Sequence, residues 1–340
     1  MQHAKSVLLS LLASLFLADT AGATAIVINP SAGLAANAPA LAAFNRAASR
    51  WGSLFADPIT VTIDADLINM GSPTILGSTS SVFLVGGYNT IRNQMVADAA
   101  DEVGNAVVAF LPTAAQFSAF VPSGFGLNNA LAGTKANLKA LGFAGLDGAF
   151  GVTDATVTFN SGFSFDFDNS DGVTAGTHDF ETVATHEIGH VLGFVSSVDV
   201  VDYYLSRQQP MNIDVELLDL FRFGPQNPAT TNDFTAFPRN LVPGTNAFFD
   251  DLSNEWAFST GYFTGDGRQA SHWKDDDITG FRIGMMDPTL ASATSWAITA
   301  ADIRALDVIG WDPLAVPEPS TLALLGLGLA GLAASRRRKQ

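Results

Sequence analysis

The sequence predicts an α+β fold, with a mixed sheet and long helices in its N-terminal part and a loop-rich C-terminal part. Apolar residues recur at helical spacing over residues 41–55, and they alternate with polar residues over 59–64, which is typical of a strand. A second helical pattern covers residues 180–192, and few regular patterns follow it. We therefore expect two subdomains with a cleft between them.

Weaker patterns fill in the elements between these segments. Residues 81–85 and 107–111 have the composition of strands, and residues 89–103 favour a helix. Alternating apolar residues on both sides of Asn160-Ser161-Gly162 predict a hairpin over 157–167. Near the end, Thr299 with Asp302 predicts a capped helix that stops at Gly310.

Composition narrows the class of protein. The chain has 340 residues, of which 47% are apolar, enough for one large or two modest domains with a core. It carries 17 basic and 33 acidic residues, a net charge of −16 that disfavours a nucleic-acid partner. It has no cysteine, so any metal must be held by His, Asp or Glu.

Residues 1–25 have the layout of a secretory signal peptide. Lys5 precedes an apolar run over 7–17, and small residues at Ala21-Gly22-Ala23 and Ala23-Thr24-Ala25 offer cleavage sites. The alternative is a buried first helix. The signal-peptide interpretation places the remaining chain outside the cytoplasm.

Residues 315–340 also have the layout of a targeting signal. Pro317-Glu318-Pro319 is followed by an apolar stretch over 322–334 and a basic cluster over 336–339. This combination resembles the PEP-CTERM sorting signal of Gram-negative bacteria, which implies an exosortase-type processing enzyme, transient anchoring in the inner membrane, and then secretion or display at the cell surface. The alternative is an ordinary C-terminal membrane anchor. Residues 26–314 remain as the working domain.

The segment His186-Glu187-Ile188-Gly189-His190 carries the chemistry. Residues four apart on a helix project from nearly the same face, so His186 and His190 can reach one ion. Zinc lowers the pKa of a bound water toward about 7, and Glu187 is placed to accept a proton from that water. The pattern indicates zinc-dependent hydrolysis.

A catalytic zinc needs a third protein ligand, and the sequence leaves the choice open. Ser196 occupies the position where a short turn after the helix would return to the metal, and Asp199 lies three residues further on. Glu216, which we expect on a helix, suits a different layout of zinc peptidase. His272 is the fourth candidate.

The motif resembles the metzincin clan of zinc endopeptidases over residues 178–313. Met286-Asp287-Pro288 looks like the Met-turn of that clan, and Ser271-His272-Trp273 is similar to the third-ligand context of its leishmanolysin-like branch. Some bacterial metalloproteases with PEP-CTERM tails share this combination. The resemblance implies a metzincin-like fold, His272 as third ligand, and a peptide substrate extended along an edge strand. Ser196 departs from the compact metzincin pattern, and the absence of cysteine removes the thiol that silences the leishmanolysin zymogen.

The resulting prediction is an exported zinc metalloendopeptidase with metal ligands His186, His190 and His272 and with Glu187 as general base. The rival from another class is a non-catalytic surface or biofilm-matrix protein stabilised by zinc. A purely structural site does not need Glu187 beside the metal, which separates the two hypotheses.

Three other features have simpler interpretations. The acidic run over 166–172 suggests a Ca²⁺ loop but is out of register with the EF-hand spacing, which favours the acidic end of a hairpin. We interpret Asp275-Asp276-Asp277 as a solvated face. Tyr203 or Tyr204 is a candidate to stabilise an oxyanion, with packed aromatic residues as the alternative, and His178 is expected at the surface.

Overall fold

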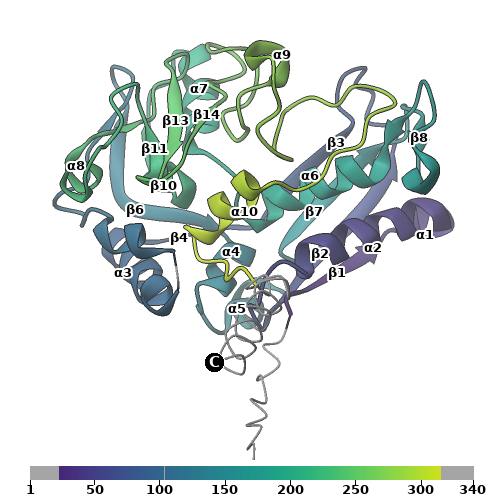
Figure 1. Cartoon of the computed structure of the whole chain (residues 1–340), viewed down its shortest axis with the longest axis horizontal. Coiled ribbons are helices and arrows are strands. Elements are labelled where there is room, and N and C mark those ends of the chain that lie inside the picture. The colour runs from purple at the N-terminus through teal and green to yellow at the C-terminus, as the bar shows by residue number, and fades with distance from the viewer. Residues whose placement is uncertain (1–22, 103, 315–340) are drawn as a thin grey trace, which may run out of the picture.

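The computed structural model describes residues 23–102 and 104–314 (Figure 1). Most of the expected signal peptide and all of the expected sorting tail lie outside these residues. Within the described part, no helix combines the length and the apolar character that crossing a membrane would need.

The N-terminal part is built on a mixed four-stranded sheet in the order β1-β2-β7-β3. β1 and β7 both pair in parallel with β2, and β3 runs antiparallel to β7 at the edge. The fold is therefore α+β with a mixed sheet, as the sequence predicts. The strands are β1 (Ala25–Pro30), β2 (Thr60–Ile68), β7 (Ala155–Asn160) and β3 (Gly77–Ser81).

Two long helices, α2 (Ala38–Gly52) and α6 (Phe180–Leu192), lie against each other on this sheet (Figure 1). α2 contacts β1, and α6 contacts β3. Trp51 of α2 donates its indole N–H to the carbonyl of Thr185, at 2.8 Å. Phe159 of β7 packs between Phe44 and Phe180, with ring centroids 5.0 and 4.4 Å away. These contacts fix α6 relative to the edge strand.

The rest of the domain consists of smaller sheets joined by short helices and loops. One sheet is β10-β6-β4, from β10 (Asn212–Glu216), β6 (Gly126–Thr134) and β4 (Phe83–Gly87). The other is β14-β13-β11-β12-β5, from β14 (Glu255–Phe258), β13 (Ala247–Asp250), β11 (Arg222–Phe223), β12 (Arg239–Asn240) and β5 (Ala119–Phe120). β8 (Phe165–Asp166) pairs with β9 (His178–Asp179).

The remaining helices are short. They are α1 (Ala32–Ala36), α3 (Tyr88–Asp98), α4 (Lys135–Ala140), α5 (Leu146–Phe150), α7 (Ser197–Ser206), α8 (Thr231–Ala236), α9 (Asp276–Thr279) and α10 (Ala300–Asp307), with 3₁₀ turns at Ala99–Asp101, Ala106–Phe110, Asn169–Asp171 and Leu217–Phe221. Between β14 and α10 the only helix is the four-residue α9, so the later part is rich in loops.

Several sequence predictions are wrong in detail. The strand expected at 81–85 is two strands that belong to different sheets, and the expected strand at 107–111 is a 3₁₀ turn. The hairpin over 157–167 does not form, because β7 pairs with β2 and β3 while β8 pairs with β9. The helix expected around Glu216 is also wrong, since that residue ends β10. For the strands and for Glu216, pairing with distant segments overrides the local pattern, whereas residues 107–111 find no strand partner among the described residues.

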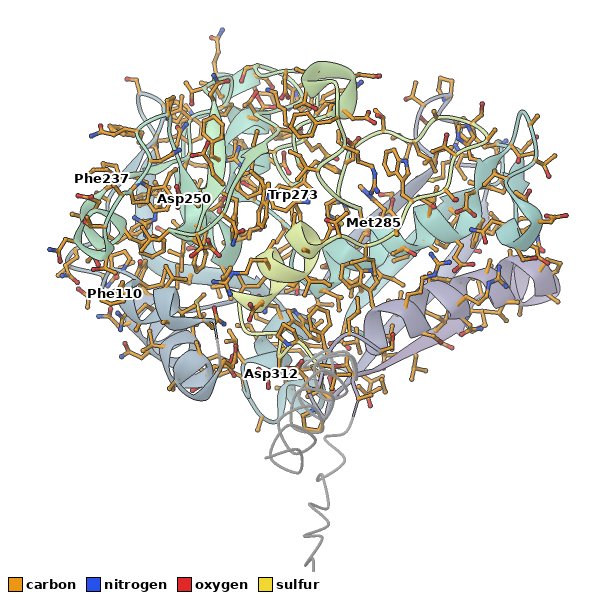
Figure 2. The ribbon with its side chains drawn as sticks, viewed as in Figure 1. Phe110, Phe237, Asp250, Trp273, Met285 and Asp312 are labelled. Carbon is orange, nitrogen blue, oxygen red and sulfur yellow. The ribbon has the colours of Figure 1, made fainter. Side chains whose placement is uncertain are left out.

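Both ends of the described chain join the same corner of the fold. Thr24 donates its backbone N–H to Phe55 at 3.1 Å, and Ala56 donates to Asp312 at 2.7 Å. Leu314 donates to Leu54 at 2.8 Å. Asp312 marks this corner at the base of the molecule (Figure 2). Thr24 and Leu314, near the two ends of the described residues, thus belong to the folded body.

Candidate metal centre

Helix α6 begins and ends at strong local signals. The carboxylate of Asp179 accepts from the backbone N–H groups of Glu181 and Thr182, which caps the N-terminus. Gly193 ends the helix in the left-handed region at φ 116°, where a residue with a Cβ would be strained. These signals set the predicted bounds of α6, and His186 and His190 lie one turn apart on it.

The structure brings His186, His190 and His272 together. The Nε2 atoms of His186 and His272 are 3.1 Å apart, and those of His190 and His186 are 3.2 Å apart. His272 arrives from the loop before α9, 82 residues beyond His190 in the sequence. The three histidines are one of three groups of described side chains whose ligand atoms lie close enough together to hold a metal ion.

Each histidine ring is oriented by a backbone carbonyl at its other nitrogen. Nδ1 of His186 lies 2.9 Å from the carbonyl oxygen of Met285. Nδ1 of His190 lies 2.7 Å from that of Phe194, and Nδ1 of His272 lies 3.1 Å from that of Gln269. A carbonyl can only accept, so each Nδ1 must carry the proton. Each Nε2 then presents a lone pair to the other two.

Burial of the rings lowers the pKa of all three histidines, to about 3 for His190 and well below the usual value for His272. For His190 and His272, the neighbouring imidazoles add to this effect. The neutral form is therefore the stable one. Three neutral acceptors pointing at one spot repel each other unless a cation lies between them.

This donor set fits zinc. Zinc binds imidazole nitrogen at roughly 2.0–2.1 Å, which places two nitrogens of a tetrahedral site about 3.4 Å apart. The observed separations of 3.1 and 3.2 Å are close to that value. Backbone acceptors on the far ring nitrogens are also the usual way in which proteins orient histidine ligands of zinc.

Glu187 follows His186 on α6 and is not one of the three converging residues. Its carboxylate accepts from the hydroxyl of Thr79 on β3 at 2.6 Å, and the same hydroxyl is 3.0 Å from its backbone carbonyl. A Cβ at Gly77 would lie 2.7 Å from Oε1 of Glu187, so the edge strand leaves room for the carboxylate only because residue 77 is glycine. Burial raises the pKa of Glu187 to about 7, although the bond from Thr79 opposes this effect.

Met286 forms the floor of the candidate centre. It is completely buried, and a Cβ on Gly189, between the two helix histidines, would lie 2.2 Å from its sulfur. The preceding residue, Met285, accepts from His186 and lies beside α6 (Figure 2). The two methionines therefore touch α6 directly under the histidines.

Asp302 holds this methionine turn in place. Its carboxylate accepts from the backbone N–H of Met285 at 2.7 Å and of Met286 at 3.2 Å, and from the indole of Trp273 at 2.8 Å. The same carboxylate completes the capping box of α10 with Thr299. One buried side chain thus links the turn, the residue after His272 and the last helix.

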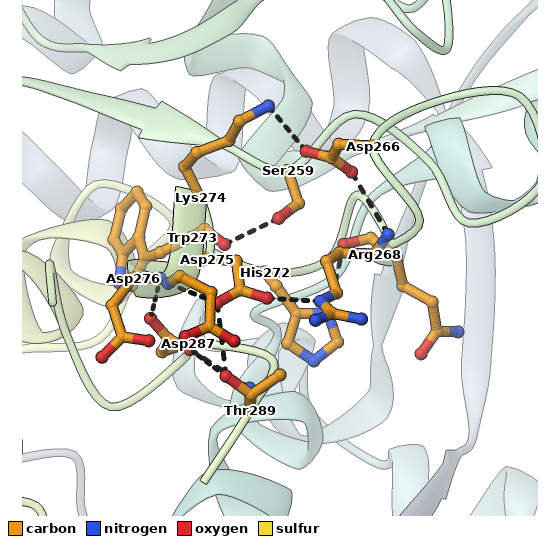
Figure 3. Close-up of polar contacts among 12 residues, drawn as sticks. Ser259, Asp266, Arg268, His272, Trp273, Lys274, Asp275, Asp276, Asp287 and Thr289 are labelled. Atoms are coloured by element: carbon orange, nitrogen blue, oxygen red, sulfur yellow. Dashed lines mark hydrogen bonds and ion pairs between the residues drawn. The ribbon is translucent and has the colours of Figure 1, made fainter. Parts of the chain in front are cut away.

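Charged residues surround His272 on its own loop (Figure 3). Asp275 is buried, pairs with Arg268 and accepts from Thr289, while Lys274 pairs with Asp266 at 2.7 Å. The interpretation of residues 275–277 as a solvated face is therefore wrong for Asp275, which also caps α9.

The other candidate ligands lie elsewhere. Ser196 caps α7, and the carboxylate of Asp199 accepts from the loop before His272. Glu216 is buried at the end of β10, where burial and two nearby carboxylates raise its pKa well above the usual value. None of them joins the three histidines among the described residues, so the layout with Glu216 as ligand is wrong.

The remaining sequence candidates do not converge on this centre. Tyr203 is 40% exposed and stacks under Arg207, and the ring of Tyr204 packs against it. In the acidic run over 166–172, the alternative Ca²⁺ loop, Asp166 accepts from Thr174, and within the described residues these acids form no converging group. His178 is half-buried in β9 against Phe163.

Sequence reasoning missed Thr79 and Gly77, which adjoin Glu187, and the role of Asp302. Local patterns carry no signal for the first two, since β3 meets α6 only in the folded chain. The capping pattern at Thr299 did identify Asp302, but only as a helix cap.

The comparisons with known proteins bear on the tail alone. Residues 315–339 match the PEP-CTERM protein-sorting motif. This match confirms the expected sorting signal and indicates export, sorting to the membrane or cell surface of a Gram-negative bacterium, and processing by an exosortase-type enzyme. Neither the curated proteins nor the solved structures contain a match to this chain.

Proposed function

We propose that residues 26–314 form an exported zinc-dependent endopeptidase with a metzincin-like fold. The observation that carries this proposal is the convergence of three neutral Nε2 atoms, two of them from a helix that also carries Glu187, a buried carboxyl that is not one of the three ligands. A site built only to hold metal has no need of a free carboxylate next to it.

His186, His190 and His272 would hold the zinc. A zinc ion bound there would polarise the carbonyl of a peptide and make water more acidic. Glu187 would accept a proton from water and later pass it to the leaving amine. A pKa near 7 suits both transfers at neutral pH, and the bond from Thr79 orients the carboxylate.

The substrate would be an extended peptide. β3 is the edge strand of its sheet and borders Glu187 through Thr79, so its free edge is available to a peptide strand. The peptide would lie in a cleft between the N-terminal sheet and the loop-rich part. Export and the sorting signal are consistent with a protein that is anchored transiently in the inner membrane and then secreted or displayed.

The test uses the purified domain and two variants. We expect about one zinc per chain, cleavage of casein that a chelator abolishes, and loss of activity with retention of zinc in Glu187→Gln. Loss of a general base costs about 10²–10⁴ in rate. Glu216→Gln is the matched control, since that buried carboxyl takes no part in the site.

Absence of zinc in the wild type would refute the proposal. Wild-type zinc content with no cleavage of any protein would instead favour the non-catalytic surface protein.

A further inference from the structure

We propose that Asp199 is a positioning residue that holds the third zinc ligand in place. This inference rests on the proposed zinc site. Asp199 lies in the first turn of α7, the helix that follows α6 directly, and its carboxylate faces the loop that carries His272.

The carboxylate binds the two residues that precede His272. Oδ1 accepts from the backbone N–H of Ala270 at 2.6 Å, and Oδ2 accepts from the backbone N–H of Ser271 at 3.1 Å and from its hydroxyl. Both oxygens are therefore occupied by this loop. A carboxylate is needed because an amide offers one acceptor and turns its NH₂ toward a backbone N–H.

We call the bonds from Asp199 to Ala270 and Ser271 the clamp, and other groups hold the same two residues. Ser196 at the start of α7 donates its backbone N–H to the hydroxyl of Ser271 at 3.1 Å. Arg222 donates to the carbonyl of Ala270 at 3.3 Å and to Ser259 at 2.7 Å. Ser259 in turn donates its N–H to the carbonyl of His272 at 3.0 Å.

The consequence is a rigid path between the helix ligands and the loop ligand. α6 carries His186 and His190, and Gly193 turns the chain into α7. Asp199 then fixes the loop so that His272 meets the other two rings. Groups that orient metal ligands typically contribute about 10–100-fold to metal affinity.

The chain offers a matched control on the same helix. Asp202 accepts from the backbone N–H of Phe263 at 2.6 Å, from that of Thr264 at 2.9 Å, and from the hydroxyl of Thr264. It makes the same pattern of bonds to an earlier part of the same connection between β14 and α9, eight and nine positions before His272. Asp199→Asn and Asp202→Asn remove the same charge and the same kind of clamp.

The experiment measures zinc affinity by competition with a chelator, and the unfolding midpoint of each protein with and without zinc. We expect Asp199→Asn to weaken zinc binding about 10–100-fold, while Asp202→Asn keeps the wild-type affinity. In chelator both variants should lose stability to a similar degree. A merely structural role for Asp199 would lower the midpoint but leave zinc affinity unchanged, and this result would overturn the inference.

If Asp199→Asn does not fold, Ser271→Ala decides the question without a change of charge. It removes one bond to Asp199 and the acceptor for Ser196, and should weaken zinc binding by at least about threefold. Unchanged affinity would reject the clamp. A wild-type protein that binds no zinc would instead reject the proposed function, so the two failures are distinguishable.

Discussion

At the residue scale, the candidate centre depends on glycine where a side chain would collide. Gly189 sits between His186 and His190 on α6 and faces the sulfur of Met286. Alanine in a helix is ordinarily better than glycine by about 1 kcal/mol. Here the missing Cβ is what allows the methionine turn to approach the helix.

We therefore expect Gly189→Ala to lower the free energy of unfolding, because overpacking costs about 1–3 kcal/mol and outweighs the gain in helix propensity. Urea unfolding in chelator measures this loss. In a double variant with Met286→Ala, the loss should be smaller than the sum of the two single losses, because removal of the methionine side chain also removes the clash. Additive losses in the double variant would show that the two residues do not compete for space.

Thr79 gives a second prediction for a single residue. Thr79→Val keeps the shape of the side chain but removes the hydroxyl that donates to Glu187 at 2.6 Å. If Glu187 is the general base, its orientation should suffer, so kcat should fall while zinc content stays constant. Thr79→Ser retains the donor and is the control. Equal kcat in the valine and serine variants would argue against a role for this bond.

At the scale of elements, the sequence predicts best those helices whose ends are marked by capping residues. Helices α6 and α10 have caps within their own sequence, and the predicted bounds of α6 agree with the structure, while the helix after Thr299 ends at Asp307 instead of Ile309. Residues 107–111 are apolar and β-branched but find no strand partner and form a 3₁₀ turn. Strand partners are chosen across the fold, where a single sequence offers no information.

The residues of the candidate site also fall into those that local spacing predicts and those that only long-range contacts reveal. His186, Glu187 and His190 follow from spacing on one helix. His272 was one of four open candidates, and only a resemblance favoured it. Asp199 and Thr79 act through contacts with residues that lie 71 and 108 positions away in the sequence. Asp302 acts largely through the backbone N–H groups of the methionine turn. No sequence motif records either kind of contact.

A prediction about how elements are joined concerns Asp302. Asp302→Asn should disturb the methionine turn and α10 together, because one carboxylate serves Met285, Met286, Trp273 and Thr299. A bond to a charged group contributes about 1.5–3 kcal/mol, so the free energy of unfolding should fall by at least about 2 kcal/mol. Thr299→Ala loses the cap and the bonds from its hydroxyl to Ile283 and Asp302 but leaves the carboxylate that holds the methionine turn, and should cost about 1 kcal/mol. Equal losses in the two variants would contradict the linking role.

At the scale of the whole molecule, several acidic side chains meet at the base. Burial raises the pKa of Asp57 and of Asp98 to about 7, with Asp312 adding to both effects, and also raises that of Glu102. Within the described residues, one carboxylate oxygen of Asp98 and one of Glu102 have no hydrogen-bond partner. The folded state therefore binds protons that the unfolded chain releases.

The stability that these carboxyls contribute should consequently be lost as the pH rises from about 5 to about 8, since the raised values lie above the usual range near 4, while the three histidines, with lowered pKa values, act in the opposite direction below about pH 6.5. Denaturant unfolding in the presence of chelator, at several pH values, measures this slope. Asp98→Asn cannot ionise and should make the slope shallower. A slope that does not change would show that Asp98 stays ionised in the fold.

The N-terminus gives a prediction about processing. Thr24 donates its hydroxyl to the carbonyl of Asp57 at 3.1 Å, and Ala25 is the first residue of β1. Cleavage after Ala25 would remove both, whereas cleavage after Ala23 leaves them in place. We therefore expect the exported protein to begin at Thr24, two residues before the boundary at Ile26 that the sequence predicts, and N-terminal sequencing checks this. A start at Ile26 would mean that β1 can lose its first residue.

The attachment of the last described residues limits how the tail can be removed. Leu314 still donates to Leu54, and Pro317-Glu318-Pro319 begins three residues later. A fully extended chain covers at most about 3.6 Å per residue, so this tether is no longer than about 11 Å. A processing enzyme that cuts at the triplet must work against the surface of the folded domain, or before that corner has closed. The length of this tether, rather than the sorting motif alone, would then decide whether removal of the tail precedes folding. If removal follows folding, a few added residues after Leu314 should make cleavage faster.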